Sequence, residues 1–354
     1  MQRLALALVF LSACGPTGSK GLTRGQTATA IAVGASHACL RVVDGTLRCF
    51  GSNESGQLGT GTTGSEPSDG GASAPPDAPR LVPGIAKVAE IAAGGAHTCV
   101  RLEDTSVRCW GANDFGQLGD ATKTARPSPV ILAGVRNVLG LAAGGAHTCA
   151  IYADKSVWCW GRNDDGQLGD GSTTSRSSPV RVQGAEEIEQ LAAGTFHTCG
   201  RRSDGAVLCW GRNDVGQIGD GTTGGPRPRA TVALGTGPAA AITAGFADTC
   251  AVLPDRTLRC WGRASGRSSA TSVLGFASVA SVSLGSSATS MQLCARLLDG
   301  SIRCAESASG APALVPGIVN AAELAGGASF TCARLSDGAA RCWAPRGEPY
   351  PVVP

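Results

Sequence analysis

Seven pairs of cysteines divide this chain at a nearly regular interval. Fourteen of its 15 cysteines belong to these pairs, and the two members of every pair are ten residues apart. The first cysteines of successive pairs are separated by 60, 50, 50, 51, 44 and 38 residues. A period near this length indicates a repeat protein, and about 40 to 50 residues suits a four-stranded blade of a β-propeller. The pairs are Cys39 and Cys49, Cys99 and Cys109, Cys149 and Cys159, Cys199 and Cys209, Cys250 and Cys260, Cys294 and Cys304, and Cys332 and Cys342.

Each pair brackets a turn signal. An aspartate lies at the midpoint of every pair, and glycine follows it in four repeats. We interpret this centre as a three-residue hairpin loop, a type I turn that ends in a left-handed residue. If Leu102 and Ser106 close the loop of the second repeat, Cys99 lies opposite Cys109 as a non-hydrogen-bonded pair, with Cα atoms about 4.5 Å apart. That distance lies within disulfide range, and a spacing of ten residues favours a bridge over a zinc site.

The same register places core-type side chains on both faces of the hairpin. A sheet that is buried on both faces is what a blade between two other blades requires. We therefore expect an all-β fold, a seven-bladed β-propeller over residues 25–354 with a cross-hairpin disulfide in each blade. In the second repeat, one face carries His97, Cys99, Val107 and Cys109, and the other carries Thr98, Val100, Leu102 and Trp110.

The repeat resembles the regulator of chromosome condensation family, whose fold is a seven-bladed propeller. The resemblance rests on residues 144–149 (GGAHTC), 157–161 (VWCWG) and 166–169 (GQLG), together with Asn163. Repeats five to seven lack the Gly-Gln-Leu-Gly turn but retain the cysteines and the aspartate, so we still expect seven blades. In these repeats the histidine becomes Asp248, Gln292 and Phe330, and the tryptophan of repeat six becomes Ala305. Because residues 349–353 resemble the strand that ends each earlier repeat, the place of ring closure stays open.

The first residues resemble the signal of a bacterial lipoprotein. An apolar run over residues 4–11 is too short to span a membrane, which takes about 20 residues, and the sequence LSAC at 11–14 follows it. We expect a signal peptide at residues 1–13, a lipidated Cys14, and a tether at 14–24. By resemblance to enterobacterial sorting, Gly15 favours the outer membrane. Export also favours disulfides, and an ordinary signal peptide is the alternative.

Composition argues against several classes of function. The net charge is +3, from 30 basic and 27 acidic residues without a Lys/Arg run, so we expect no nucleic-acid partner. All four histidines stand two residues before the first cysteine of a pair, and we interpret them as repeat residues that are hydrogen-bonded inside each blade. With no histidine outside this pattern, the sequence offers no Ser/His or Cys/His nucleophile. We expect no enzyme activity, cofactor or metal.

One turn varies between the first four repeats while its frame stays the same. The frame is Asn-x-x-Gly-Gln, and equivalent loops of a propeller lie on one face, where variation often marks recognition. Phe115 is a candidate hot spot for binding. The alternative is that these are solvated turn residues; the calcium-like run at 163–166 lacks a full ligand set and also indicates a turn. The variable pairs are Glu54 and Ser55, Asp114 and Phe115, Asp164 and Asp165, and Asp214 and Val215.

These features predict an exported, lipid-anchored propeller that acts as a protein-binding module at the bacterial envelope. We expect a monomer with an unknown protein partner and a membrane contact through the lipid on Cys14. The Gly/Ser/Pro-rich insert at 60–80 is expected to be a mobile surface loop. Alternatives are a passive surface protein and an enzyme that acts on envelope polysaccharide or peptide. The resemblance implies nucleotide exchange by name only; exported members include a beta-lactamase inhibitory protein that binds with one propeller face.

Overall fold

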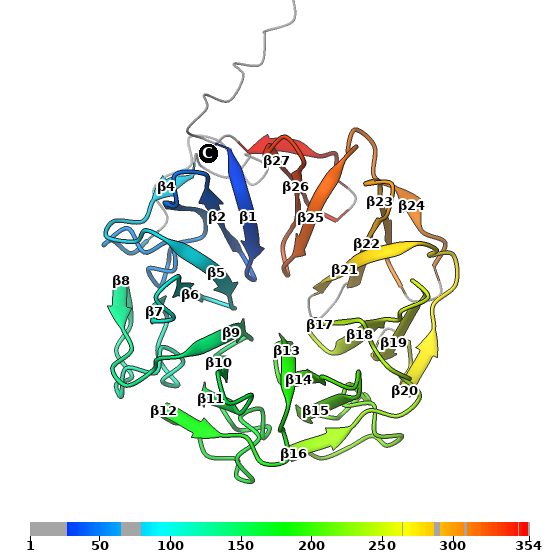
Figure 1. Cartoon of the computed structure of the whole chain (residues 1–354), viewed down its shortest axis with the longest axis horizontal. Coiled ribbons are helices and arrows are strands. Elements are labelled where there is room, and N and C mark those ends of the chain that lie inside the picture. The colour runs from blue at the N-terminus through cyan, green and yellow to red at the C-terminus, as the bar shows by residue number, and fades with distance from the viewer. Residues whose placement is uncertain are drawn as a thin grey trace, which may run out of the picture.

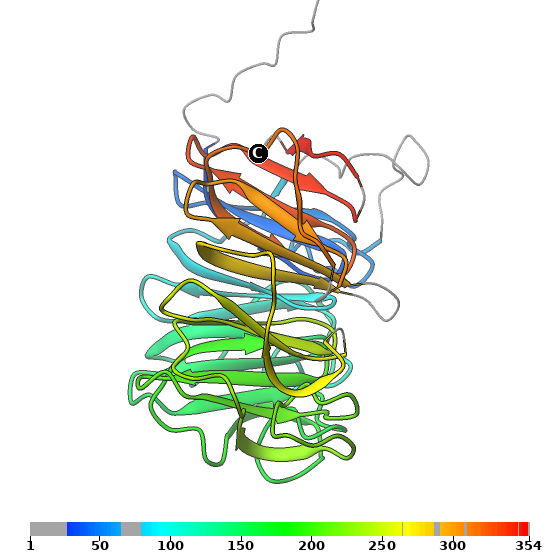
Figure 2. The ribbon, with the colours of Figure 1, turned by 90° about the vertical axis from the view of Figure 1, so that its right-hand side faces the viewer.

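The chain forms a ring of seven four-stranded antiparallel sheets (Figure 1). The computed structural model describes residues 27–64, 79–263, 265–286, 291–307, 310–345 and 347–352. In these residues every regular element is a strand, so none of them belongs to a helix that could cross a membrane. Figure 2 shows the ring from its side. The expected seven-bladed β-propeller is confirmed.

Each blade is built from four consecutive strands, and the first strand of each lies nearest the axis. Blade 1 contains β1 (Ala28–Val33), β2 (His37–Val42), β3 (Leu47–Gly51) and β4 (Arg80–Leu81). Blade 2 contains β5 (Val88–Ala93), β6 (His97–Leu102), β7 (Val107–Gly111) and β8 (Arg126–Ile131). Blade 3 contains β9 (Val138–Ala143), β10 (His147–Tyr152), β11 (Val157–Gly161) and β12 (Arg176–Arg181). Blade 4 contains β13 (Ile188–Ala193), β14 (His197–Arg202), β15 (Val207–Gly211) and β16 (Arg227–Val232).

The last three blades follow the same order with shorter outer segments. Blade 5 contains β17 (Ala241–Ala244), β18 (Asp248–Val252), β19 (Leu258–Gly262) and β20 (Arg267–Ser272). Blade 6 contains β21 (Val279–Ser286), β22 (Met291–Leu297), β23 (Ile302–Ala305) and β24 (Ala313–Leu314). Blade 7 contains β25 (Ala321–Gly326), β26 (Thr331–Leu335), β27 (Ala340–Trp343) and β28 (Tyr350–Val352).

The central hairpins have the expected register. Cys99 lies opposite Cys109 with a Cα–Cα distance of 4.1 Å, and the two sulfurs are bonded. Thr105 takes the left-handed place in the loop, with φ at 66°. Asp104 stabilises the loop because its carboxylate accepts the backbone N–H of Ser106 at 3.0 Å.

The other six cysteine pairs are bonded in the same way. Each bridge joins the second strand of a blade to the third, with a Cα–Cα distance of 4.0 to 4.1 Å. Every cysteine of the described residues is therefore bonded within its own blade. These six bridges join Cys39 to Cys49, Cys149 to Cys159, Cys199 to Cys209, Cys250 to Cys260, Cys294 to Cys304, and Cys332 to Cys342.

Both faces of the blades are buried, as the alternation predicts. Cys99 and Val107 pack with Leu141 of blade 3 in one apolar cluster. Val100 and Trp110, on the other face of the same hairpin, pack with residues of blade 1. Each apolar cluster therefore belongs to a junction between two blades, and the core is a ring of such junctions.

The histidines link neighbouring blades, which corrects the expectation that they bond inside one blade. The Nε2 atom of His97 lies 2.9 Å from the Thr148 hydroxyl of the next blade. That hydroxyl donates to the main-chain oxygen of Gln117 at 2.8 Å, so His97 Nε2 carries the proton and donates to Thr148. Burial lowers the pKa of His97 to about 3, which keeps the ring neutral. The equivalent contacts are His37 to Thr98, His147 to Thr198 and His197 to Thr249.

The Gly-Gln-Leu-Gly turn anchors the tryptophan of the following blade. The carbonyl oxygen of Gln117 accepts the indole N–H of Trp160 at 2.9 Å. Gly119 lies against this ring with φ at 73°, and a Cβ there would be 2.7 Å from the indole nitrogen. The same bond joins Gln57 to Trp110, Gln167 to Trp210 and Gln217 to Trp261.

In the irregular repeats, the loss of the turn in one blade is matched in two cases by the loss of the tryptophan in the next blade. Blades 5 and 7 lack the turn, and the next blade has Ala305 or Phe50 in place of tryptophan, so no indole N–H needs an acceptor. At the junction of blades 7 and 1, Phe330 stacks on Phe50 with a centroid distance of 6.2 Å. At the junction of blades 6 and 7, the Thr331 hydroxyl donates to Gln292 Oε1 at 2.8 Å.

The ring closes between complete blades. Strands β25 to β28 form blade 7 without a strand from the N-terminal part of the described chain. The segment at 349–353 thus contributes the outer strand β28, as its resemblance to earlier repeats indicates. Blade 1 meets blade 7 through a bond from Ala28 N–H to Gly338 O at 3.0 Å and one from Ser329 N–H to Ala35 O at 3.0 Å.

Two expectations fall wholly or partly outside the described residues. The signal peptide, Cys14 and the tether lie in the segment 1–26, which is not described. Of the insert at 60–80, residues 65–78 are not described, and β4 begins at Arg80.

Candidate functional site

The two faces of the ring carry different loops. One face carries the loops before β2, β6, β10, β14 and β18 together with the Asn-x-x-Gly-Gln turns, and we call it the turn face. Both sets of loops lie on this face because the start of β2 is next to the end of β3: His37 lies opposite Gly51. The hairpin face carries the aspartate loops and the connections from each outer strand to the next blade. This division follows from the antiparallel order of each sheet. It places all four variable pairs on the turn face.

Asparagine and glutamine side chains hold the variable turns in one shape. In blade 2, Gln117 Oε1 accepts the backbone N–H of Phe115 at 3.0 Å, and Asn113 Oδ1 accepts that of Leu118 at 3.0 Å. Blades 1, 3 and 4 repeat both bonds. These bonds support the turn interpretation of residues 163–166. In every turn the first variable residue is exposed and the second is half-buried: Glu54 and Ser55, Asp114 and Phe115, Asp164 and Asp165, Asp214 and Val215.

Arginines and phenylalanines alternate across the turn face from blade 2 to blade 5. The Arg162 guanidinium carbon lies 5.1 Å from the Phe115 ring centroid and 5.4 Å from that of Phe196. Arg212 lies 4.6 Å from the Phe196 ring. At these distances arginine and the ring face attract each other. Phe196 also meets Phe246 edge to face at 5.5 Å, and Arg263 lies 5.0 Å from Phe246. We call these six residues the Arg–Phe row: Phe115, Arg162, Phe196, Arg212, Phe246 and Arg263.

The predicted acidic residues join this row in part. Arg162 pairs with Asp164 at 2.8 Å, within one turn. Arg212 pairs with Asp165 of the preceding blade at 3.1 Å and with Asp214 of its own turn at 3.0 Å. Burial raises the pKa of Asp165, and the positive charge of Arg212 opposes this shift. The structure therefore brings Phe115, Asp164, Asp165 and Asp214 into one network, with Glu54, Ser55, Asp114 and Val215 at turn positions around it.

Phe196, Phe246 and the arginines were not among the residues predicted from the sequence. Their signal was a local departure from the repeat: residues 94–96 and 144–146 are both Gly-Gly-Ala, whereas 194–196 are Gly-Thr-Phe and 245–247 are Gly-Phe-Ala. A large aromatic residue where repeats two and three have alanine or glycine does not serve the shared frame. The same comparison would have found arginine at 162, 212 and 263, where blade 2 has Ala112.

The centre of the turn face is narrow and lined by small residues. A hollow of about 90 Å³ lies there, bordered by loops from all around the ring, including Gly34, Gly94 and Gly144. Phe246 of the Arg–Phe row also borders it. Because this hollow is small, a partner that binds the turn face would contact mainly the loops around it, where the Arg–Phe row lies.

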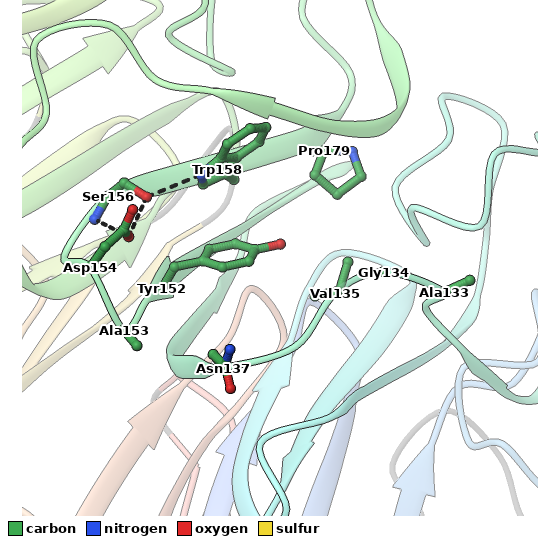
Figure 3. Close-up of a pocket in the computed structure, with 10 residues that line it drawn as sticks. All are labelled: Ala133, Gly134, Val135, Asn137, Tyr152, Ala153, Asp154, Ser156, Trp158 and Pro179. Carbon is green, nitrogen blue, oxygen red and sulfur yellow. Dashed lines mark hydrogen bonds between the residues drawn. The ribbon is translucent and has the colours of Figure 1, made fainter.

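The hairpin face contains an open hollow of about 540 Å³ between blades 2 and 3 (Figure 3). Tyr152 and Trp158 line it, with ring centroids 5.9 Å apart. The Ser156 hydroxyl donates to Asp154 at 2.6 Å and accepts the Trp158 indole N–H at 3.1 Å. Burial, and then the charge of Asp154, raise the pKa of Tyr152. This hollow is a second candidate contact surface, walled by aromatic rings.

The acidic residues of the Arg–Phe network and the four histidines are paired or buried. On the turn face, the carboxylates Asp164, Asp165 and Asp214 are paired with arginines. The four histidines are buried in the blade junctions with strongly lowered pKa values. Within the described part of the chain, no group of three or more His, Cys, Asp or Glu residues is placed to hold a metal ion.

A family model described as "RCC1-like domain" matches residues 13–281. Human protein RCC2 is 37% identical over 99 residues, which are 27% of this chain and 17% of RCC2. The Arabidopsis thaliana ultraviolet-B receptor UVR8 is 33% identical over 99 residues, which are 28% of this chain and 21% of the receptor. The matched segment thus spans about a fifth of these relatives.

Solved structures share the fold at low sequence identity. Yeast RCC1 (Prp20), solved bound to Kap60, matches with a TM-score of 0.60 at 18% identity over 89% of this chain and 69% of that chain. The CRINKLY WD40 ectodomain of the Arabidopsis thaliana receptor kinase ACR4 matches with a TM-score of 0.57 at 20% identity over 90% of this chain and 98% of that chain. At this identity the likeness supports the architecture alone.

Proposed function

This chain belongs to the RCC1-like domain family, and from that membership together with the Arg–Phe row we propose that it binds a protein partner on its turn face. The observation that carries the proposal is the row itself. Phe196 and Phe246 occupy positions where repeats two and three have alanine and glycine, respectively, so the repeat frame does not require them. Aromatic residues and arginine are the types most enriched at protein interfaces and hot spots.

The chemistry of the row favours a protein over a polyanion. Two of its arginines, Arg162 and Arg212, are paired with aspartates of the variable turns, so the face presents both signs of charge around half-buried rings. An interface of this kind supplies hydrogen bonds in several directions and an apolar centre. The precedent in the family is a protein complex, because yeast RCC1 was solved bound to Kap60.

We further propose that the protein acts outside the cytoplasm, anchored to the outer membrane of a bacterial envelope by lipid on Cys14. Two observations support this proposal: the apolar run that precedes LSAC at 11–14, and seven bonded cysteine pairs in one chain. Disulfides in such number persist in oxidising compartments. The Cys14→Ser variant is expected to leave the membrane fraction or to remain unprocessed. A wild-type chain that is soluble and begins elsewhere by mass spectrometry would contradict the anchor.

The binding proposal is tested with a partner isolated from envelope extract and two matched variants. Phe115→Ala removes a half-buried ring of the row, and Tyr152→Ala removes a half-buried ring of the hairpin face. We expect Phe115→Ala to weaken the affinity for the partner tenfold or more, since an interface anchor contributes about 2 kcal/mol and each decade is about 1.4 kcal/mol. Tyr152→Ala should bind as the wild type does. Loss of affinity in Tyr152→Ala with full affinity in Phe115→Ala would move the site to the hairpin face.

A further inference from the structure

Two aromatic residues of blade 3 depart from the repeat at the hollow of about 540 Å³ on the hairpin face. Trp158 stands directly before the second cysteine of its blade, where blades 1, 2, 5, 6 and 7 have arginine. Tyr152 stands three residues after the first cysteine, where the same five blades have valine or leucine. The frame shared by the blades therefore requires neither ring, and both of them line the hollow.

In blade 5 the arginine at this position reaches across the junction with the preceding blade. The Arg259 guanidinium donates to the main-chain oxygen of Gly235, which lies in the connection between β16 and β17. Gly134 has the equivalent place before blade 3, because it precedes Trp158 by 24 residues, as Gly235 precedes Arg259. Gly134 and Trp158 both line the hollow. The hollow thus lies between the two positions that an arginine side chain connects in blade 5.

Two half-buried aromatic rings form walls of this hollow (Figure 3). The planes of Tyr152 and Trp158 are tilted by 52° to each other. The indole N–H of Trp158 donates to the Ser156 hydroxyl at 3.1 Å, which fixes the orientation of the ring. A guanidinium group stacks favourably on such a ring face, and the chain itself uses this contact on the turn face, where Arg212 lies 4.6 Å from the Phe196 ring centroid.

Asp154 is the one charged residue among those that the structure places around the hollow. Hydrogen bonds within its own loop lower the pKa of this carboxyl, and the charge of Arg181 adds to the shift, so the group is ionised at neutral pH. Arg181 itself does not border the hollow. Lys155 Nζ lies 3.9 Å from Glu189 of blade 4, and Arg136 borders a separate hollow beside the hairpin of blade 2. The hollow therefore presents a negative charge and two ring faces, which together attract a cation.

We propose that this hollow binds an arginine side chain of a second protein partner, whose guanidinium stacks on Trp158 and donates to the Asp154 carboxylate and to the main-chain oxygen of Gly134. The bound arginine takes the place that Arg259 takes at the junction of blades 4 and 5. A guanidinium can stack through its face while its in-plane N–H groups reach two acceptors, which an ammonium group cannot do. The site lies on the face opposite the Arg–Phe row, so either proposal can fail while the other stands.

The probe is N-acetyl-arginine N-methylamide, whose one charge is the guanidinium. The full chain is labelled with ¹⁵N at tryptophan, and the indole N–H resonances are followed as the probe is added. We expect the Trp158 resonance to shift in a saturable way, while that of Trp210, which is buried in a blade junction, stays unchanged. The citrulline derivative is a neutral isostere and should cause no saturable shift, and the lysine derivative should bind more weakly. A citrulline or lysine derivative that binds as tightly as the arginine derivative would contradict a guanidinium site.

A matched pair of aspartate substitutions tests the role of the carboxylate. Asp154→Asn removes the charge while the amide oxygen can still accept the hydrogen bonds of the loop. It should weaken probe binding about tenfold, the effect of one hydrogen bond to a charged group. Asp104→Asn makes the same change in the hairpin of blade 2 and should bind the probe as the wild type does. Equal binding by the wild type and Asp154→Asn would overturn the proposal.

A further variant fills the hollow from within the chain. Trp158→Arg restores the residue that five other blades carry, so the fold should accept it, and the introduced guanidinium should occupy the hollow. Because this variant lacks the Trp158 resonance, binding is followed by saturation transfer from the protein to the probe. We expect transfer in the wild type and none in Trp158→Arg. Equal transfer in both proteins, or a Trp158 resonance of the wild type that does not move, would overturn the proposal.

Discussion

Each buried histidine makes the fold sensitive to acid. In the unfolded chain a histidine takes up a proton near pH 6.5, whereas burial lowers the pKa of His97 and His147 to about 3 and that of His37 and His197 to about 4. Below pH 6.5 the unfolded state therefore binds more protons than the native state, and the free energy of unfolding decreases as the pH is lowered. The stabilising effect is complete above pH 6.5 and is lost progressively down to about pH 4 or 3.

This linkage predicts a measurable decrease in the free energy of unfolding between pH 6.5 and pH 5, above the range in which the hairpin aspartates titrate. Each neutral buried histidine changes the free energy of unfolding by about 1.6 kcal/mol over that interval, because the unfolded ring is half protonated at pH 6.5 and the limiting slope is about 1.36 kcal/mol for each pH unit. Urea unfolding should show the free energy of unfolding fall over this range, and His97→Gln should reduce the fall by about a quarter. An unchanged free energy of unfolding between the two pH values would contradict the conclusion that these buried histidine rings are neutral in the native state.

At the scale of the element, the outer turn of one blade is part of the core of the next. The Gln117 carbonyl accepts hydrogen bonds from both Thr148 and Trp160. Each of blades 1 to 4 is therefore bonded to the next blade through its turn, its histidine, and the threonine and tryptophan of that next blade. The sequence pattern identified the turn but not its partner, because hydrogen bonding between residues about 30 to 60 positions apart leaves no local signal. The sequence shows this hydrogen bonding only indirectly, because the turn in one repeat occurs together with a tryptophan in the next.

A matched pair of tryptophan substitutions tests this interpretation. Trp160→Phe leaves the Gln117 carbonyl with one donor fewer and should lower the free energy of unfolding by about 1 to 2 kcal/mol. Trp343→Phe removes a buried N–H that has no acceptor and should be neutral or slightly stabilising. Denaturant unfolding of the two variants measures the difference. Equal destabilisation would show that the rings, and not their N–H groups, account for the effect.

At the scale of the whole molecule, the cysteine spacing was enough to predict the architecture. An odd loop centred on aspartate determines the register of the hairpin, and Cys99 then has to meet Cys109. Core-type residues on both faces determine that blades pack on blades. The same reasoning could not place the histidine bonds, because a pattern within one repeat does not distinguish contacts inside a blade from contacts across a junction.

The candidate binding surface was found only in part. Phe115 was visible as a variable position inside a constant turn, whereas Phe196 and Phe246 stood outside the turn motif. They come together because the loops before β14 and β18 lie on the turn face beside the turns of blades 3 and 4. Adjacency of loops from successive blades is a property of the ring, and single repeats do not show it.

Hydrogen–deuterium exchange of the complex with its partner shows which face of the ring the partner covers. We expect the partner to protect peptides covering residues 113–119, 163–169 and 194–197 on the turn face. Peptides covering the hairpin loops at 103–106 and 153–156 should exchange as they do in the free chain. Protection of the hairpin loops with unchanged exchange at the turns would contradict the assignment of the turn face as the protein-binding surface.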